Sequence, residues 1–86
     1  MNKENTSPTR EEILATSLDA RIQEVMHYQV NIDNYVLALE EIDNLPPNER
    51  DELSAFAEQL RTLLIGERLE QKKARIMLCA LKRQVR

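Results

Sequence analysis

The 86-residue sequence has one glycine, one cysteine, one histidine and no tryptophan. One glycine and three prolines are too few for the tight turns that connect the strands of β-rich folds. A single cysteine excludes an internal disulfide and a CxxC pair, and with one histidine it leaves too few ligands for a zinc finger. No apolar run approaches the roughly 20 residues that span a bilayer, and the first residues do not resemble a signal peptide. These shortages favour one small α-helical domain.

The first long helix is predicted over residues 8–44, after a flexible arm at residues 1–7. Ser7 can cap a helix that begins at Pro8, or Thr9 and Glu12 can form a capping box slightly later. No glycine or proline follows until Pro46, so nothing in this stretch breaks the helix.

The turn is predicted at residues 45–48, where two prolines follow Leu45. A second helix then covers residues 47–84. Gly66 lies inside this helix and allows a bend, although the apolar heptads continue through it without a change of phase.

Both helices repeat apolar residues at spacings of three and four, which is typical of a coiled-coil seam. In the first helix the predicted seam consists of Ala15, Leu18, Ile22, Val25, Gln29, Ile32, Val36 and Leu39. In the second it consists of Leu53, Ala57, Leu60, Leu64, Glu67, Gln71, Ala74, Leu78, Leu81 and Val85. We therefore predict an all-α fold, an antiparallel two-helix hairpin. The polar seam residues Gln29, Glu67 and Gln71 form either a buried polar network or a device that fixes the register.

The charges divide between the two arms. Residues 1–58 carry a net charge of −9 and residues 59–86 a net charge of +6, which gives the overall charge of −3. If the two arms lie antiparallel with a turn near Pro46, acids of one arm face bases of the other. The predicted register pairs are Glu12 with Lys82, Asp19 with Arg75, Asp33 with Arg61, and Arg21 with Glu70.

More apolar residues are present than one seam can bury. A strip of this size predicts that the hairpin dimerises into a four-helix bundle, that it binds another protein, or both. The candidate oligomer or partner surface comprises Tyr28, Tyr35, Phe56, Leu63, Met26, Val30, Leu37, Ile65, Leu69, Ile76 and Cys79.

Catalytic constellations are missing from the sequence. His27 lies on the predicted outer face of the first helix. We interpret Cys79 as a small apolar packing residue whose thiol stays reduced in the cytoplasm. No phosphate-binding loop, HExxH motif or metal-ligand cluster occurs. We therefore expect a cytoplasmic, non-enzymatic regulator, inhibitor or adaptor, with no cofactor and no small-molecule substrate.

Two alternatives involve nucleic acids. In the first, a hairpin dimer binds RNA or DNA through bases of the second helix. The candidate contacts are the bases that the register pairs leave over, namely Lys72, Lys73, Arg83 and Arg86.

In the second alternative, the acidic turn mimics a nucleic acid and blocks a DNA-binding protein. This acidic tip comprises Glu40, Glu41, Asp43, Glu49, Asp51 and Glu52. Its charge opposes binding to an anionic membrane surface, so we expect no membrane role.

Overall fold

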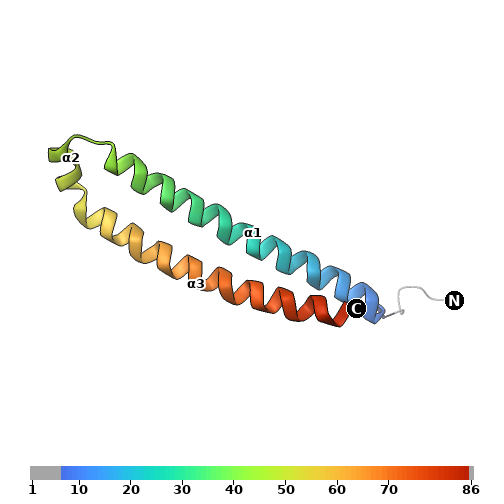
Figure 1. Cartoon of the computed structure of the whole chain (residues 1–86). Helices are drawn as coiled ribbons and strands as arrows, with labels where there is room; N and C mark the ends of the chain where they lie inside the picture. Colours follow the sequence, from blue (N-terminus) through green and yellow to red (C-terminus); the bar gives the residue numbers. More distant parts are fainter. Residues whose placement is uncertain (1–6, 86) are drawn as a thin grey trace.

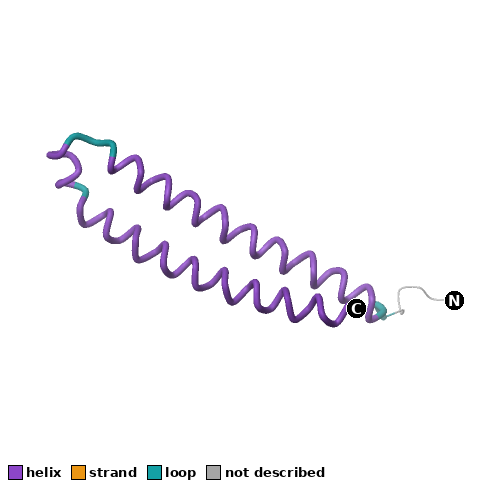
Figure 2. Tube along the Cα trace, viewed as in Figure 1, coloured by secondary structure: helices purple, strands orange, loops and turns teal. Residues whose placement is uncertain are grey.

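The computed structural model describes residues 7–85, which form an antiparallel helical hairpin (Figure 1). Helix α1 spans Arg10–Asp43, the short helix α2 spans Pro47–Glu52, and α3 spans Ser54–Val85. The two long helices run side by side and the loops are confined to the turn and the start of α1 (Figure 2). The predicted all-α hairpin is thereby confirmed for this part of the chain. The predicted arm lies outside the described residues except for Ser7.

Helix α1 begins with Thr9 as its N-cap. The Thr9 side-chain oxygen accepts a hydrogen bond of 3.2 Å from the backbone N–H of Glu12. Thr9 itself is extended, with φ −73° and ψ 163°, as expected for a residue that precedes the first helical turn. Of the two capping positions that the sequence allowed, the structure uses the later one, Thr9, through the Thr9 half of the predicted capping box.

The turn is longer than the sequence predicts, because α2 is a separate helix. At the end of α1 the backbone N–H of Asn44 donates hydrogen bonds to the carbonyls of Glu40 and Ile42. Pro47 begins α2, where its missing N–H leaves no unpaired donor. At Leu53 the backbone leaves the helical conformation, with φ −101° and ψ 10°, and α3 starts at Ser54. The second arm is therefore interrupted at Leu53.

Helix α3 continues through Gly66 without interruption. A Cβ atom at Gly66 would meet no heavy atom of the neighbouring described residues within 4 Å. Glycine inside a helix costs about 1 kcal/mol relative to alanine. The packing within residues 7–85 gives no reason for this cost.

The buried face of α3 is the predicted seam. Its buried residues are Ala57, Leu60, Leu64, Gln71 and Ala74, with 4–8% of their surface exposed.

The buried face of α1 is rotated from the prediction. Ile22, predicted in the seam, is 40% exposed, whereas Ile42 is buried and Tyr28 and Tyr35 are half-buried. Ile42 packs with Ala57 and Leu60 near the turn, and Tyr35 covers this cluster. The face of α1 against α3 thus combines the Leu18, Val25, Ile32 and Leu39 column with the Tyr28, Tyr35 and Ile42 column.

The molecule is a thin rod of 72 × 26 × 16 Å. Its radius of gyration is 20.2 Å, compared with about 12 Å for a globular domain of this length. A two-helix layer buries only one side of each helix, so most apolar side chains outside the seam stay exposed.

Candidate interaction surfaces

Gln71 is the buried polar side chain at the middle of the seam, with 7% of its surface exposed. Its Nε2 donates to the Oε1 of Gln29 at 2.8 Å and to the backbone carbonyl of Val25 at 3.2 Å. Gln29 in turn donates from its Nε2 to Asp33 Oδ1 at 2.9 Å. Two of the predicted polar seam residues therefore meet in a hydrogen-bonded network that leaves no buried side-chain polar atom unpaired within residues 7–85.

Glu67, the third polar seam residue, accepts a hydrogen bond of 3.3 Å from Asn31 Nδ2 on α1. The residue numbers of this pair add up to 98, and those of Gln71 with Val25 and Gln29 add up to 96 and 100. The predicted register pairs add up to 94 or 91. At the middle of the seam the arms are therefore offset from the predicted register, in the direction expected from the longer turn. Near the free ends, Arg10 donates to Gln84 Oε1 at 3.4 Å, and this pair adds up to 94.

The predicted ion pairs between the arms do not form. The ion pairs between described residues all lie within one helix, three residues apart. They join Arg21 to Glu24 at 3.2 Å, Arg61 to Glu58 at 2.9 Å, and Lys73 to Glu70 at 3.0 Å. Glu12, Asp19 and Lys82 are exposed and form no ion pair in this part of the chain. The rotation of α1 turns Glu12 and Asp19 away from α3. Asp33 still lies beside bases of α3, but it accepts a hydrogen bond from Gln29, and within residues 7–85 it forms no ion pair with them.

Bases of α3 consequently lie opposite polar and apolar residues of α1. Arg68, Lys72 and Arg75 line a groove together with Gln29, Ile32, Asp33, Val36 and Gln71. Lys82 and Arg83 continue the basic character toward the C-terminal end and are also exposed. Arg86, the last candidate nucleic-acid contact, lies outside the described residues.

An apolar strip runs along the outer side of α3, away from the seam. We call it the outer strip; it comprises Ile65, Leu69, Ile76 and Cys79. Ile65, Leu69 and Ile76 are 68%, 51% and 62% exposed. Ile76 and Cys79 lie in a shallow hollow whose rim includes Lys72, Arg75 and Arg83. On α1 the exposed apolar residues of the predicted surface are Met26, Val30 and Leu37.

A second apolar face lies on one side of the hairpin. We call it the lateral face; on α3 it comprises Phe56, Leu63, Gly66 and Met77. Phe56, Leu63 and Met77 are 44–50% exposed. Tyr28 and Tyr35, predicted on the same apolar edge, are half-buried on α1 instead.

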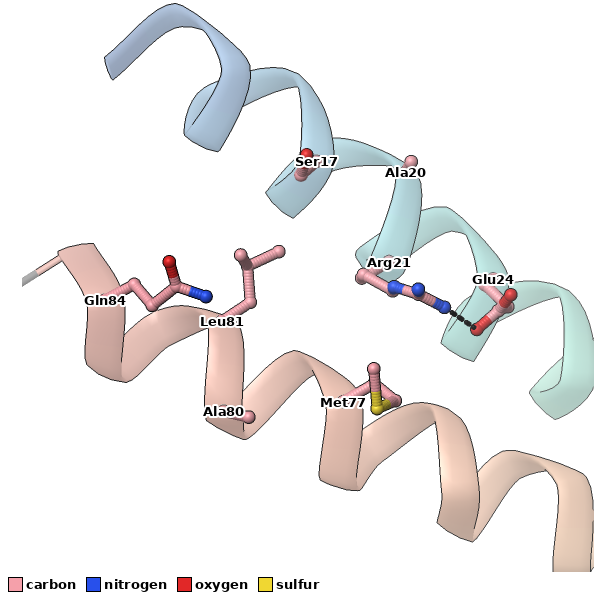
Figure 3. A pocket seen from close by; sticks show the side chains of 8 residues that line it. All are labelled: Ser17, Ala20, Arg21, Glu24, Met77, Ala80, Leu81 and Gln84. Atoms are coloured by element: carbon pink, nitrogen blue, oxygen red, sulfur yellow. Dashed lines mark hydrogen bonds and ion pairs between the residues drawn. The ribbon is translucent and has the colours of Figure 1, made fainter. Parts of the chain in front are cut away.

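A groove on this side of the molecule separates the two arms toward their free ends (Figure 3). Met77, Ala80 and Leu81 reach it from α3, and Ser17 and Ala20 from α1. Arg21 and Glu24 pair with each other along its α1 wall. The sequence prediction did not identify this groove. Its signal is the small size of Ser17, Ala20 and Ala80, which leave space beside the seam.

The residues of the acidic tip are all exposed and surround the turn at one end of the rod. The free ends of α1 and α3 lie at the opposite end (Figure 1). Between residues 72 and 85, α3 carries five bases and no acid. The rod thus has an acidic end at the turn and a basic stretch of α3 at the other.

Residues 7–85 contain no group of three or more potential metal-ligating side chains. None of the helices in this range combines the length and apolar character that a bilayer-spanning segment needs. His27 is exposed and packs edge-on against the ring of Tyr28, with ring centroids 6.5 Å apart.

No protein-family model, no curated protein and no solved structure matches the chain.

Proposed function

We propose that the chain is a non-enzymatic cytoplasmic protein that self-associates and acts by binding another protein, as a small regulator, inhibitor or adaptor. The observation that carries this proposal is the exposed apolar surface of the rod. Thirteen large apolar side chains of the described residues are at least 36% exposed. Exposed apolar side chains that gather on one face of a helix, such as Ile65, Leu69 and Ile76, mark interaction sites on soluble proteins.

The apolar residues lie on more than one side of the rod, which supports two different contacts. The lateral face flanks the seam, whereas the outer strip points away from it. A second hairpin covers one side of a two-helix layer and leaves the opposite side free. We therefore assign the lateral face to self-association and the outer strip to the partner protein.

The surroundings of the outer strip indicate the chemistry of the partner. Its apolar centre, Ile76 and Cys79, is bordered by the bases Lys72, Arg75 and Arg83. An amphipathic helix with an apolar face and acidic flanks would match both features. The exposed, unpaired Cys79 is consistent with a reducing compartment.

Affinity capture with matched variants tests the partner-binding half of this proposal. The tagged chain is incubated with extract of its source organism, in parallel with a Leu69→Lys/Ile76→Lys variant and a Gln23→Lys control on the exposed side of α1. We expect one protein to be retained by the wild type and the control and lost with the double variant. Equal retention by all three would contradict the assignment of the outer strip.

A second candidate function is binding of RNA or DNA. One observation favours it: the α3 bases Arg68, Lys72 and Arg75 form no ion pair with acids of α1 in residues 7–85. Binding through these bases would weaken with salt in proportion to the phosphates neutralised. Titration of a labelled RNA or DNA duplex at 50 and 200 mM salt tests it, with Lys72→Gln/Arg75→Gln as the variant. An affinity that changes neither with the salt concentration nor in the Lys72→Gln/Arg75→Gln variant would exclude this function.

A further inference from the structure

We propose that two copies of the chain pack antiparallel through the lateral face, with their α3 helices crossing at Gly66. This inference rests on the self-association in the proposed function and adds the surface, the orientation and the crossing point.

Gly66 provides the first observation. It is exposed, it lies in the interior of the uninterrupted helix α3, and a Cβ there would touch nothing in the described part of its own chain. An α-helix turns by about 100° per residue, so Gly66, Leu63, Phe56 and Met77 lie within about 80° of its circumference. Glycine on an apolar helix face lets a second backbone approach closely. The free energy that Gly66 costs α3 is explained if a second helix crosses α3 at this residue.

The positions of the large side chains provide the second observation. Phe56 lies ten residues before Gly66 and Met77 lies eleven after it. A twofold axis at Gly66 therefore brings Phe56 of each copy beside Met77 of the other, which makes the contact self-complementary. Met77 lines the groove between the free ends of the arms, together with Ala80 of its own helix and Ala20 of α1 (Figure 3). The Phe56 ring, 48% exposed on the free hairpin, would fill this groove on the second copy.

The charge distribution fixes the orientation. In an antiparallel pair the acidic tip of each copy lies beside the basic end of α3 in the other. Glu49 and Glu52 of one copy then approach Lys82 and Arg83 of the second. A parallel pair would instead place the two acidic tips together, and like charges in contact oppose association.

Disulfide trapping tests the crossing point and the orientation. All variants carry Cys79→Ala, which removes the single native thiol. A disulfide needs Cα atoms about 4.4–6.8 Å apart. We expect rapid cross-linking of Gly66→Cys on mild oxidation, and of Phe56→Cys mixed with Met77→Cys. Ile65→Cys, one residue away on another side of α3, and Phe56→Cys alone serve as controls that stay uncross-linked.

Three outcomes would overturn the inference. Cross-linking of Ile65→Cys as fast as Gly66→Cys would place the contact on another face. Cross-linking of Phe56→Cys with itself, and not with Met77→Cys, would contradict the antiparallel orientation. In both cases the self-association of the proposed function stands. A wild-type chain that stays monomeric in sedimentation would contradict this inference and also the self-association in the proposed function.

A bulky side chain at Gly66 gives an independent test. Gly66→Leu favours the helix of the single hairpin, so retained helical circular dichroism is expected. The same change should raise the dimer dissociation constant at least tenfold, because it separates the two backbones. Gln23→Leu, on the exposed side of α1, is the matched control and should leave the constant unchanged. A Gly66→Leu chain that dimerises as tightly as the wild type would overturn the crossing at Gly66.

Discussion

The side-chain amide of Gln71 donates a hydrogen bond of 2.8 Å to Gln29 across the α1–α3 seam. The same nitrogen also lies 3.2 Å from the carbonyl of Val25, so a single buried amide on α3 contacts two successive turns of α1. Sliding the arms past each other would leave this amide buried without a partner. Burying an unpaired polar group costs roughly 1–3 kcal/mol, so the pair disfavours other registers.

Removing the Gln71 side chain should destabilise the hairpin. Gln71→Ala deletes both hydrogen bonds and leaves Gln29 Oε1 without its donor, so we expect the free energy of unfolding to fall by about 1–3 kcal/mol. Urea denaturation followed by circular dichroism, at one fixed protein concentration, measures the change. Gln23→Ala, an exposed glutamine of α1, should change stability by less than about 0.5 kcal/mol. Equal effects of the two substitutions would mean that the network contributes nothing.

Double-mutant cycles distinguish the observed register from the one that the charges predict. Asp19 and Arg75 form no ion pair within residues 7–85, so reversing both charges should give no coupling beyond the roughly 0.3 kcal/mol expected of independent sites. Asn31→Ala and Glu67→Ala remove two ends of one hydrogen bond and should couple by about 0.5 kcal/mol or more. Coupling of the first pair without the second would restore the predicted register.

The cluster next to the turn should carry a large share of the packing energy. Leu60 is 5% exposed and contacts the Ile42–Ala57 cluster, so Leu60→Ala should destabilise the chain by about 2–3 kcal/mol. Leu69→Ala is the matched control on the same helix, because Leu69 is 51% exposed. Its effect on unfolding at low protein concentration should be below about 1 kcal/mol. Thermal denaturation of both variants decides whether the cluster has this role.

The Thr9 cap should stabilise the free end of α1. Thr9→Ala removes the acceptor for the Glu12 N–H and should cost about 0.5–2 kcal/mol, whereas Thr9→Ser retains it. Hydrogen exchange of the first turn of α1 measures the effect locally. Faster exchange in Thr9→Ser as well as in Thr9→Ala would show that the hydroxyl is not the stabilising group.

The seam of α3 could be predicted from the sequence because one apolar column pair dominates that helix. The seam of α3 is bordered on one side by Arg61, Arg68 and Arg75. Burying an unpaired arginine is unfavourable, so the buried face is the one formed by Ala57, Leu60, Leu64 and Ala74. In α1 the choice is ambiguous. The Leu18–Val25–Ile32–Leu39 column has apolar neighbours on both sides, namely Ile22 and Val36 on one and Tyr28, Tyr35 and Ile42 on the other. Packing against α3 selects the second side, and a pattern within one helix does not contain this information.

The offset of the arms at the middle of the seam has a related cause. Pro46 and Pro47 mark the turn correctly, but the break at Leu53 has no glycine or proline to signal it. If the turn contains two helical residues more or two fewer, each charged residue of α3 shifts by part of a helical turn relative to its predicted partner on α1. The exposure of Val30, Leu37, Ile65 and Ile76 was predicted correctly, because these residues lie far from the seam whichever side of α1 faces α3.

Sedimentation velocity of the full chain over a range of about 1 to 100 µM tests the proposed self-association most directly. The exposed lateral face predicts a concentration-dependent shift from a 10.0 kDa monomer to a dimer of twice that mass. Phe56→Ser should move this shift to higher concentration. A wild-type chain that sediments as a 10.0 kDa monomer throughout the range would contradict the proposal.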